Sequence, residues 1–126
     1  MRLLLDTHAV LGAVARVDEL PTRVRALLED GANDCYVSAA STWELALETV
    51  GGTVELELEE LMSELRVLGF NELRVSFAHT KRAASLPPLH HDPFARLLVA
   101  QALEEGLTLV TADPTLSAYA VPIFWE

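Results

Sequence analysis

The chain has 126 residues, 51% of them hydrophobic, and a formal net charge of −10 at pH 7. This length and composition predict a single folded domain over residues 1–126. They exclude an intrinsically disordered chain, which would have a low hydrophobic content. The acidic balance excludes a protein that coats nucleic acid through a broad basic surface. It does not exclude a nuclease, because bound cations can supply the positive charge that a phosphate group needs.

Cysteine content and hydropathy point to the cytoplasm. The single cysteine, Cys35, cannot form an internal disulfide, and it is best explained as a small buried hydrophobic residue. No apolar stretch reaches the length of a membrane span, so we expect no membrane association. The opening residues MRLLLDTHAV resemble a signal peptide only briefly, because Asp6 ends the apolar run.

Strand-like and helix-like segments alternate along the chain. In chain order, we expect a strand at 2–5, helices at 7–16 and 21–31, a strand at 35–38, helices at 41–51 and 58–70, a strand at 73–76, helices at 77–86 and 92–106, a strand at 107–111, a helical turn from 114 and an edge strand at 123–125. This order predicts an α/β domain with a mainly parallel central sheet of four or five strands and right-handed crossovers.

Capping residues set the ends of several predicted helices. Pro21 suits the first turn of the second helix. The third helix has Ser41 as its expected N-cap. Asp92 is the expected N-cap of the last long helix, and Gly106 is its expected C-terminal stop. The leucines of the helix at 58–70 lie on one face, where they could form a two-fold interface or cover the sheet.

Three acids follow predicted strands. Asp6 comes directly after the first strand, Glu44 lies in the first turn of the helix after the second, and Asp113 lies two residues past the fourth. Strand ends and the starts of following helices share one edge of a parallel sheet, so these side chains should converge. Converging carboxylates repel one another, and Mg²⁺ or Mn²⁺ would remove the conflict and activate water for phosphodiester cleavage.

Each acid also has a local structural explanation. Asp6 and Asp113 can each cap the helical segment that follows. Ser41 and Glu44 match a capping box, in which each side chain satisfies a backbone donor. Asp92, immediately before a proline, is best explained as an N-cap, although it could also bind a metal through water. Three acids at one edge of a sheet are nevertheless more than capping alone explains.

Four segments carry a family resemblance: LLLDTHAVL, SAASTWELALE, LPPLHHDPFARLLVAQA and LVTAD. Together they resemble the PIN-domain ribonucleases, in particular the VapC toxins of toxin–antitoxin pairs. The resemblance implies a three-layer α/β/α sandwich, a metal-dependent endoribonuclease using Mg²⁺ or Mn²⁺, a homodimer, and inhibition by a small VapB-like antitoxin. It assigns the metal-binding and catalytic roles to Asp6, Glu44 and Asp113, with Thr111 as a nearby hydroxyl.

The same resemblance shows one missing carboxylate. Related toxins usually read DPFDR where this chain reads DPFAR, so Ala95 occupies the position of a family metal-site aspartate. Its absence predicts a damaged site and reduced activity. A naturally weakened relative and a deliberate substitution both explain it, and the otherwise intact motifs favour the second. The alternative function is a degenerate, non-catalytic PIN domain that only binds an antitoxin or RNA.

The remaining candidates have more ordinary interpretations. His90 and His91 could be metal ligands, but paired loop histidines are more often solvated, and imidazole does not suit a hard Mg²⁺ site. Arg96 could contact an RNA phosphate or lie along the surface. Trp43 is expected in the core, because base-stacking aromatics occur in groups. A phosphotransfer domain is disfavoured, because Asp6 has no second acid beside it.

Overall fold

The computed structural model describes residues 1–126 and contains one five-stranded sheet in the order β3-β2-β1-β4-β5. The strands are β1 (Arg2–Leu5), β2 (Asp34–Ser38), β3 (Asn71–Leu73), β4 (Thr108–Val110) and β5 (Ile123–Phe124). All four neighbouring pairs are parallel, which confirms the predicted sheet and its edge strand. The strand order reverses between β1 and β4, and ligands bind at such a switch point in open α/β sheets.

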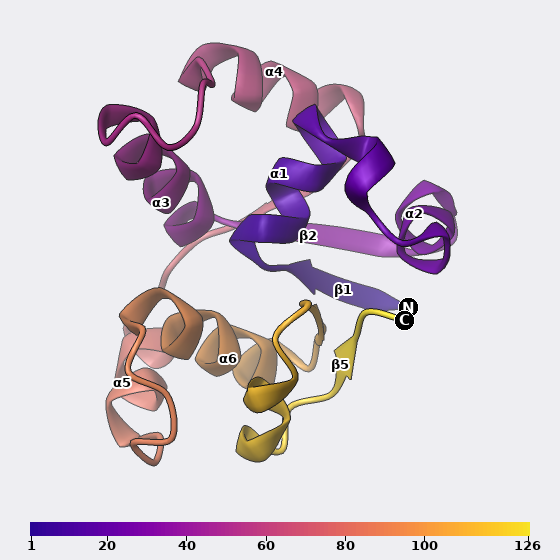
Figure 1. The fold of residues 1–126 in the computed structure, drawn as a ribbon. Helices are drawn as coiled ribbons and strands as arrows, with labels where there is room; N and C mark the ends of the chain where they lie inside the picture. Colours follow the sequence, from indigo (N-terminus) through magenta and orange to yellow (C-terminus); the bar gives the residue numbers. More distant parts are fainter.

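Helices cover both faces of this sheet, which confirms the three-layer α/β/α architecture (Figure 1). One layer holds α1 (Thr7–Ala15), α2 (Thr22–Glu29), α3 (Ala39–Val50) and α4 (Leu58–Val67). The other layer holds α5 (Phe77–Ser85) and α6 (Pro93–Glu105). Two 3₁₀ helices, η1 (Val17–Glu19) and η2 (Pro114–Tyr119), follow α1 and β4.

The β1 strand divides its side chains between two hydrophobic cores. Leu3 and Leu5 pack in the cluster formed with α1, α2, α3 and α4, and Leu4 packs with α6, β4 and η2. All three leucines are 0% exposed. A strand buried on both faces needs a continuous apolar run rather than alternation, which is the pattern that this segment shows. Helices on both sides of β1 thus fix the position of Asp6, the residue that follows it.

The start of α3 differs from the prediction. The helix begins at Ala39, and its N-cap is Ser38, whose hydroxyl accepts a 3.0 Å hydrogen bond from the backbone N–H of Ala40. Ser41 lies inside the helix with a buried hydroxyl that has no partner. The predicted capping box between Ser41 and Glu44 is therefore wrong, because Glu44 lies one turn beyond the position that a box would need.

Three other sequence expectations are corrected. The third strand lies at residues 71–73 rather than 73–76. These are the residues that pair with β2, and Asn71 lies opposite Tyr36. Pro21 precedes α2 as its N-cap instead of lying in its first turn. Trp43 is 59% exposed and not part of the core, because it lies on the outer face of α3.

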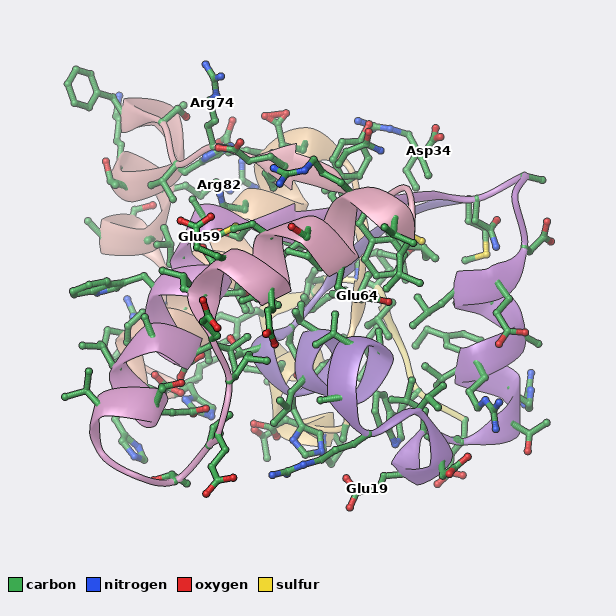
Figure 2. All side chains as sticks on the ribbon, turned by 90° about the horizontal axis from the view of Figure 1, so that it is seen from above. Glu19, Asp34, Glu59, Glu64, Arg74 and Arg82 are labelled. Atoms are coloured by element: carbon green, nitrogen blue, oxygen red, sulfur yellow. The ribbon has the colours of Figure 1, made fainter.

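The amphipathic helix α4 faces the core with its leucines. Leu61 and Leu65 are buried in the cluster with α1, so this face covers the sheet. Glu59 and Glu64 lie on the opposite, outer face of the helix layer (Figure 2). Glu59 and Glu60, in the first turn of α4, are therefore solvated, and their negative charges also suit the helix dipole. No helix in the structure is both long and apolar enough to cross a bilayer.

Candidate active site

A cavity of about 210 Å³ opens where β1 and β4 end, at the switch point of the sheet. Five carboxylates and two histidines line it, and no Lys or Arg does. The carboxylates are Asp6, Glu44, Glu48, Asp92 and Asp113. The structure thus brings all three predicted site acids to one cavity, together with Asp92, Thr111 and Ala95.

Asp6 reaches the cavity from the junction of β1 and α1. Its Oδ1 accepts a 2.8 Å hydrogen bond from the backbone N–H of Ala9, so Asp6 is the N-cap of α1. Burial raises the pKa of the Asp6 carboxyl, and the charge of Asp113 adds to this rise. The Thr111 hydroxyl and the Ala9 N–H oppose it, because they stabilise the charged form.

Glu44 and Glu48 lie one turn apart on α3 and both line the cavity. Burial raises the pKa of Glu44, and the neighbouring charges of Asp92, Glu48 and Asp6 raise it further. The buried Thr7 hydroxyl forms no hydrogen bond of acceptable geometry. It nevertheless lies close to the Glu44 carboxyl and lowers its pKa, which opposes the rise. Sequence reasoning did not single out Glu48, although its spacing of four residues from Glu44 places both on one helix face.

Asp113 is the most tightly bonded acid of the cavity. Its Oδ1 accepts hydrogen bonds from the backbone N–H of Thr115 at 3.0 Å and from the Thr115 hydroxyl at 2.6 Å. Its Oδ2 lies 3.1 Å from Nε2 of His90. These contacts, led by the Thr115 hydroxyl, lower the pKa of Asp113. The backbone N–H of Asp113 in turn donates to the hydroxyl of Thr111 at 3.1 Å, which ties the two residues together.

The N-terminus of α6 supplies Asp92 and Ala95. Oδ1 of Asp92 accepts a 2.9 Å hydrogen bond from the backbone N–H of Phe94, which makes it the predicted N-cap. Ala95 lies one turn further along, and its methyl group lines the cavity. A carboxylate at this position would add a further oxygen ligand to the same wall.

Arg96 is not among the residues that line the cavity. Its guanidinium donates to the backbone carbonyls of Ala83, Leu86 and Pro87 at 2.9, 3.1 and 2.9 Å. It also lies 3.3 Å from the hydroxyl of Tyr119. These bonds tie the C-terminal end of α5 to α6, and they engage both terminal nitrogens of the guanidinium.

The donor chemistry of the cavity fits a hard divalent cation. Carboxylate oxygens are the ligands that Mg²⁺ prefers, and mutual repulsion contributes to the raised pKa values of Asp6 and Glu44. No three His, Cys, Asp or Glu side chains are grouped closely enough to hold a metal directly. Mg²⁺ usually keeps several waters and binds through one or two carboxylates, so the acids present suit a partly hydrated ion.

A parallel sheet between two helix layers, with carboxylates gathered at its switch point, defines an α/β domain with an acidic ligand-binding cavity. The family model of the PIN domain matches residues 3–122. The chain therefore belongs to the PIN domain family, as its four motifs predict. PIN domains are generally nucleases.

Several solved structures share this fold. VapBC2 from Rickettsia felis, bound to a promoter DNA fragment, matches with a TM-score of 0.70, 18% identity and 100% coverage of both chains. FitAcB from Neisseria gonorrhoeae matches with a TM-score of 0.66, 23% identity and coverage of 97% of this chain and 96% of that one. A toxin–antitoxin complex from Klebsiella pneumoniae matches with a TM-score of 0.67, 15% identity and coverage of 97% and 95%. A comparison with curated proteins found no match.

Proposed function

We propose that this chain is a VapC-type toxin: a cytoplasmic, Mg²⁺- or Mn²⁺-dependent endoribonuclease whose activity is weakened by Ala95. The observation that supports this most is the cavity with five carboxylates and no Lys or Arg. An RNA phosphate would be repelled from such a cavity unless a cation balanced the negative charge. Membership of the PIN domain family supports the nuclease class.

Asp6 and Asp113 would hold the cation, with Glu44 bound to it directly or through water. When bound, the ion supplies an activated water and neutralises charge on the phosphate. Thr111 accepts a hydrogen bond from the backbone N–H of Asp113, and its hydroxyl also lowers the pKa of Asp6, so it lies beside both of these ligands. We assign Asp92 a water-mediated contact with the ion, while one of its oxygens caps α6.

An antitoxin partner and a homodimer complete the proposal. The antitoxin is supported by the similar fold of chains from three toxin–antitoxin systems. The homodimer is supported by an exposed apolar stripe on α3, formed by Trp43, Leu47 and Val50 at helical spacing. These side chains are 59%, 43% and 89% exposed, so a protein partner would remove a sizeable apolar surface from water.

Replacing Ala95 by Asp tests the enzymatic proposal. We expect Ala95→Asp to raise the rate of RNA cleavage in Mg²⁺ or Mn²⁺ by roughly 10² to 10⁴, the usual contribution of one electrostatic or acid–base group. A chelator should abolish the gain. The matched control is Ala84→Asp on the exposed side of α5, which should leave the rate unchanged. A folded, metal-loaded Ala95→Asp protein that cleaves no RNA in a broad panel would refute the proposal.

The second candidate function is a degenerate PIN domain that only binds. It is favoured by Ala95 and by the lack of three closely grouped ligands. This function predicts a stable complex with a VapB-like antitoxin and no gain of activity in Ala95→Asp. Co-purification and cleavage assays on the same preparations distinguish the two candidates.

A further inference from the structure

His90 is held at three atoms. Its backbone N–H donates to the hydroxyl of Tyr119 at 2.8 Å, its Nδ1 accepts from the backbone N–H of Asp92 at 3.1 Å, and its Nε2 lies 3.1 Å from Oδ2 of Asp113. The side chain is 20% exposed, and the ring of His91 stacks on it at 5.5 Å between centroids. A loop histidine with this many contacts is fixed in position, which differs from the solvated residue expected from the sequence.

The contact with Asp92 decides which ring nitrogen carries the proton. A backbone N–H can only donate, so Nδ1 must be the unprotonated nitrogen of the ring. The proton of the neutral imidazole then resides on Nε2, which donates to the Asp113 carboxylate. His90 therefore links the N-terminus of α6 to the start of η2.

The hydrogen bonds of Asp113 leave few directions for a cation. An ionised carboxylate has about four lone-pair directions, two on each oxygen. Thr115 uses both directions on Oδ1, and His90 uses one on Oδ2. The direction that remains free is on Oδ2, the oxygen that His90 bonds. The orientation of that bond therefore sets how Asp113 presents its free lone pair to the cavity.

We propose that His90 is a positioning residue for metal binding, which fixes the Asp113 carboxylate through its Nε2–H while the backbone of Asp92 fixes the tautomer. This inference rests on the proposed function in that the group bound by Asp113 is the divalent cation. Hydrogen-bond partners of ligating carboxylates orient the ligands, and their loss costs about 10- to 100-fold in metal affinity.

Two variants separate the donor from the size of the side chain. His90→Leu removes the N–H donor, whereas His90→Gln keeps an amide N–H at a similar reach. In the metal-free protein, long-range ¹H–¹⁵N spectra should place the His90 proton on Nε2. The ¹³C resonance of the Asp113 carboxyl should move in His90→Leu and move far less in His90→Gln. His91→Leu, which removes only the stacked neighbour, is the control and should leave that resonance in place.

Mn²⁺ titrations in the Ala95→Asp background give a second readout. His90→Leu should weaken Mn²⁺ binding about 10- to 100-fold, and His90→Gln should recover most of it. A proton on Nδ1, or an Asp113 resonance unmoved by His90→Leu, would overturn the inference even if no metal bound. Unchanged Mn²⁺ affinity in His90→Leu would also overturn it. An Ala95→Asp protein that binds Mn²⁺ in a His90-dependent way but cleaves no RNA would refute the nuclease instead.

Discussion

The backbone N–H of Ala9 donates to Oδ1 of Asp6, so one carboxylate both caps α1 and lines the acidic cavity. Asp92 and Asp113 are likewise the N-caps of α6 and η2 while they line the same cavity. Each of these aspartates can therefore cap a helix and also contribute to the candidate site. A helix N-terminus also holds a carboxylate rigidly, which is what a preorganised ligand needs.

Two substitutions of Asp6 separate its two roles. Asp6→Asn keeps an effective N-cap but removes the charge, so we expect loss of metal-dependent cleavage without loss of stability. Asp6→Ala should lose the same activity and be about 1 kcal/mol less stable than Asp6→Asn, because the Ala9 N–H loses its acceptor. Both are best made in Ala95→Asp, with cleavage and urea unfolding measured on the same samples. Equal stability of the two variants would contradict the capping role.

The raised pKa of Asp6 predicts a dependence of stability on pH in the metal-free protein. The folded state holds this proton more tightly than the unfolded state, so stability falls as pH rises from the ordinary carboxyl value, about 4, through the raised pKa. Asp6→Asn lacks this loss, so its advantage over the parent should grow with pH across that window. Asp113 has the opposite dependence and Glu44 has the same one, but both residues are present in both proteins, so their contributions largely cancel from the difference.

Urea unfolding at several pH values measures this difference. Asp18→Asn is the matched control, because Asp18 has a 96% exposed side chain. Saturating Mg²⁺ should reverse the trend for the parent, because the ion binds the charged form. A stability difference that does not change with pH would show that Asp6 is not perturbed by burial.

Two serines test where α3 begins. Ser38→Ala removes the observed N-cap and should cost about 1 kcal/mol of stability. Ser41→Ala removes a buried hydroxyl without a partner and should raise stability by up to about 1 kcal/mol. Thermal or urea unfolding of both variants provides the measurement. The reverse ranking would mean that the helix starts at Ser41, as the capping-box pattern predicts.

Replacing Arg96 by Lys distinguishes its bonds to α5 from a phosphate contact. Lysine keeps the charge but loses the planar donor fork, so the three carbonyl bonds cannot all be kept. We expect Arg96→Lys to cost about 1–3 kcal/mol of stability with RNA affinity nearly unchanged. Arg74→Lys, at a side chain that is 89% exposed, is the control for stability. A stable Arg96→Lys protein with weakened RNA binding would favour the phosphate contact.

The sequence predicted the parts of the fold that depend on local signals. Runs of apolar residues marked β1, β2 and β4, because strands covered on both faces must be apolar throughout. Asp92 and Gly106 marked the ends of α6, because a cap and a positive φ of 67° depend on the residue type at that position. A helix start with two candidate caps was less certain, because Ser38 and Ser41 both suit the start of α3 by residue type.

Long-range contacts were beyond the reach of local patterns. The third strand pairs with β2 at residues 71–73, so the strand expected at 73–76 was placed too late in the chain. Trp43 is exposed because α3 turns another face to the core, a choice that its residue type does not reveal. Glu48 joins the cavity only because α3 packs against α1 and α6, although its helical spacing from Glu44 was visible in the sequence.

The sequence by itself determined which elements form, their order, and the placement of three acids after strand ends, because these features depend on residue type and spacing along the chain. The tertiary structure alone decided which polar groups surround each acid. His90, which is 23 residues from Asp113 in the chain, reaches its carboxylate only when α6 and η2 pack together. Burial and hydrogen bonding act through space, so the different pKa shifts of Asp6 and Asp113 follow from packing rather than from their neighbours in the sequence.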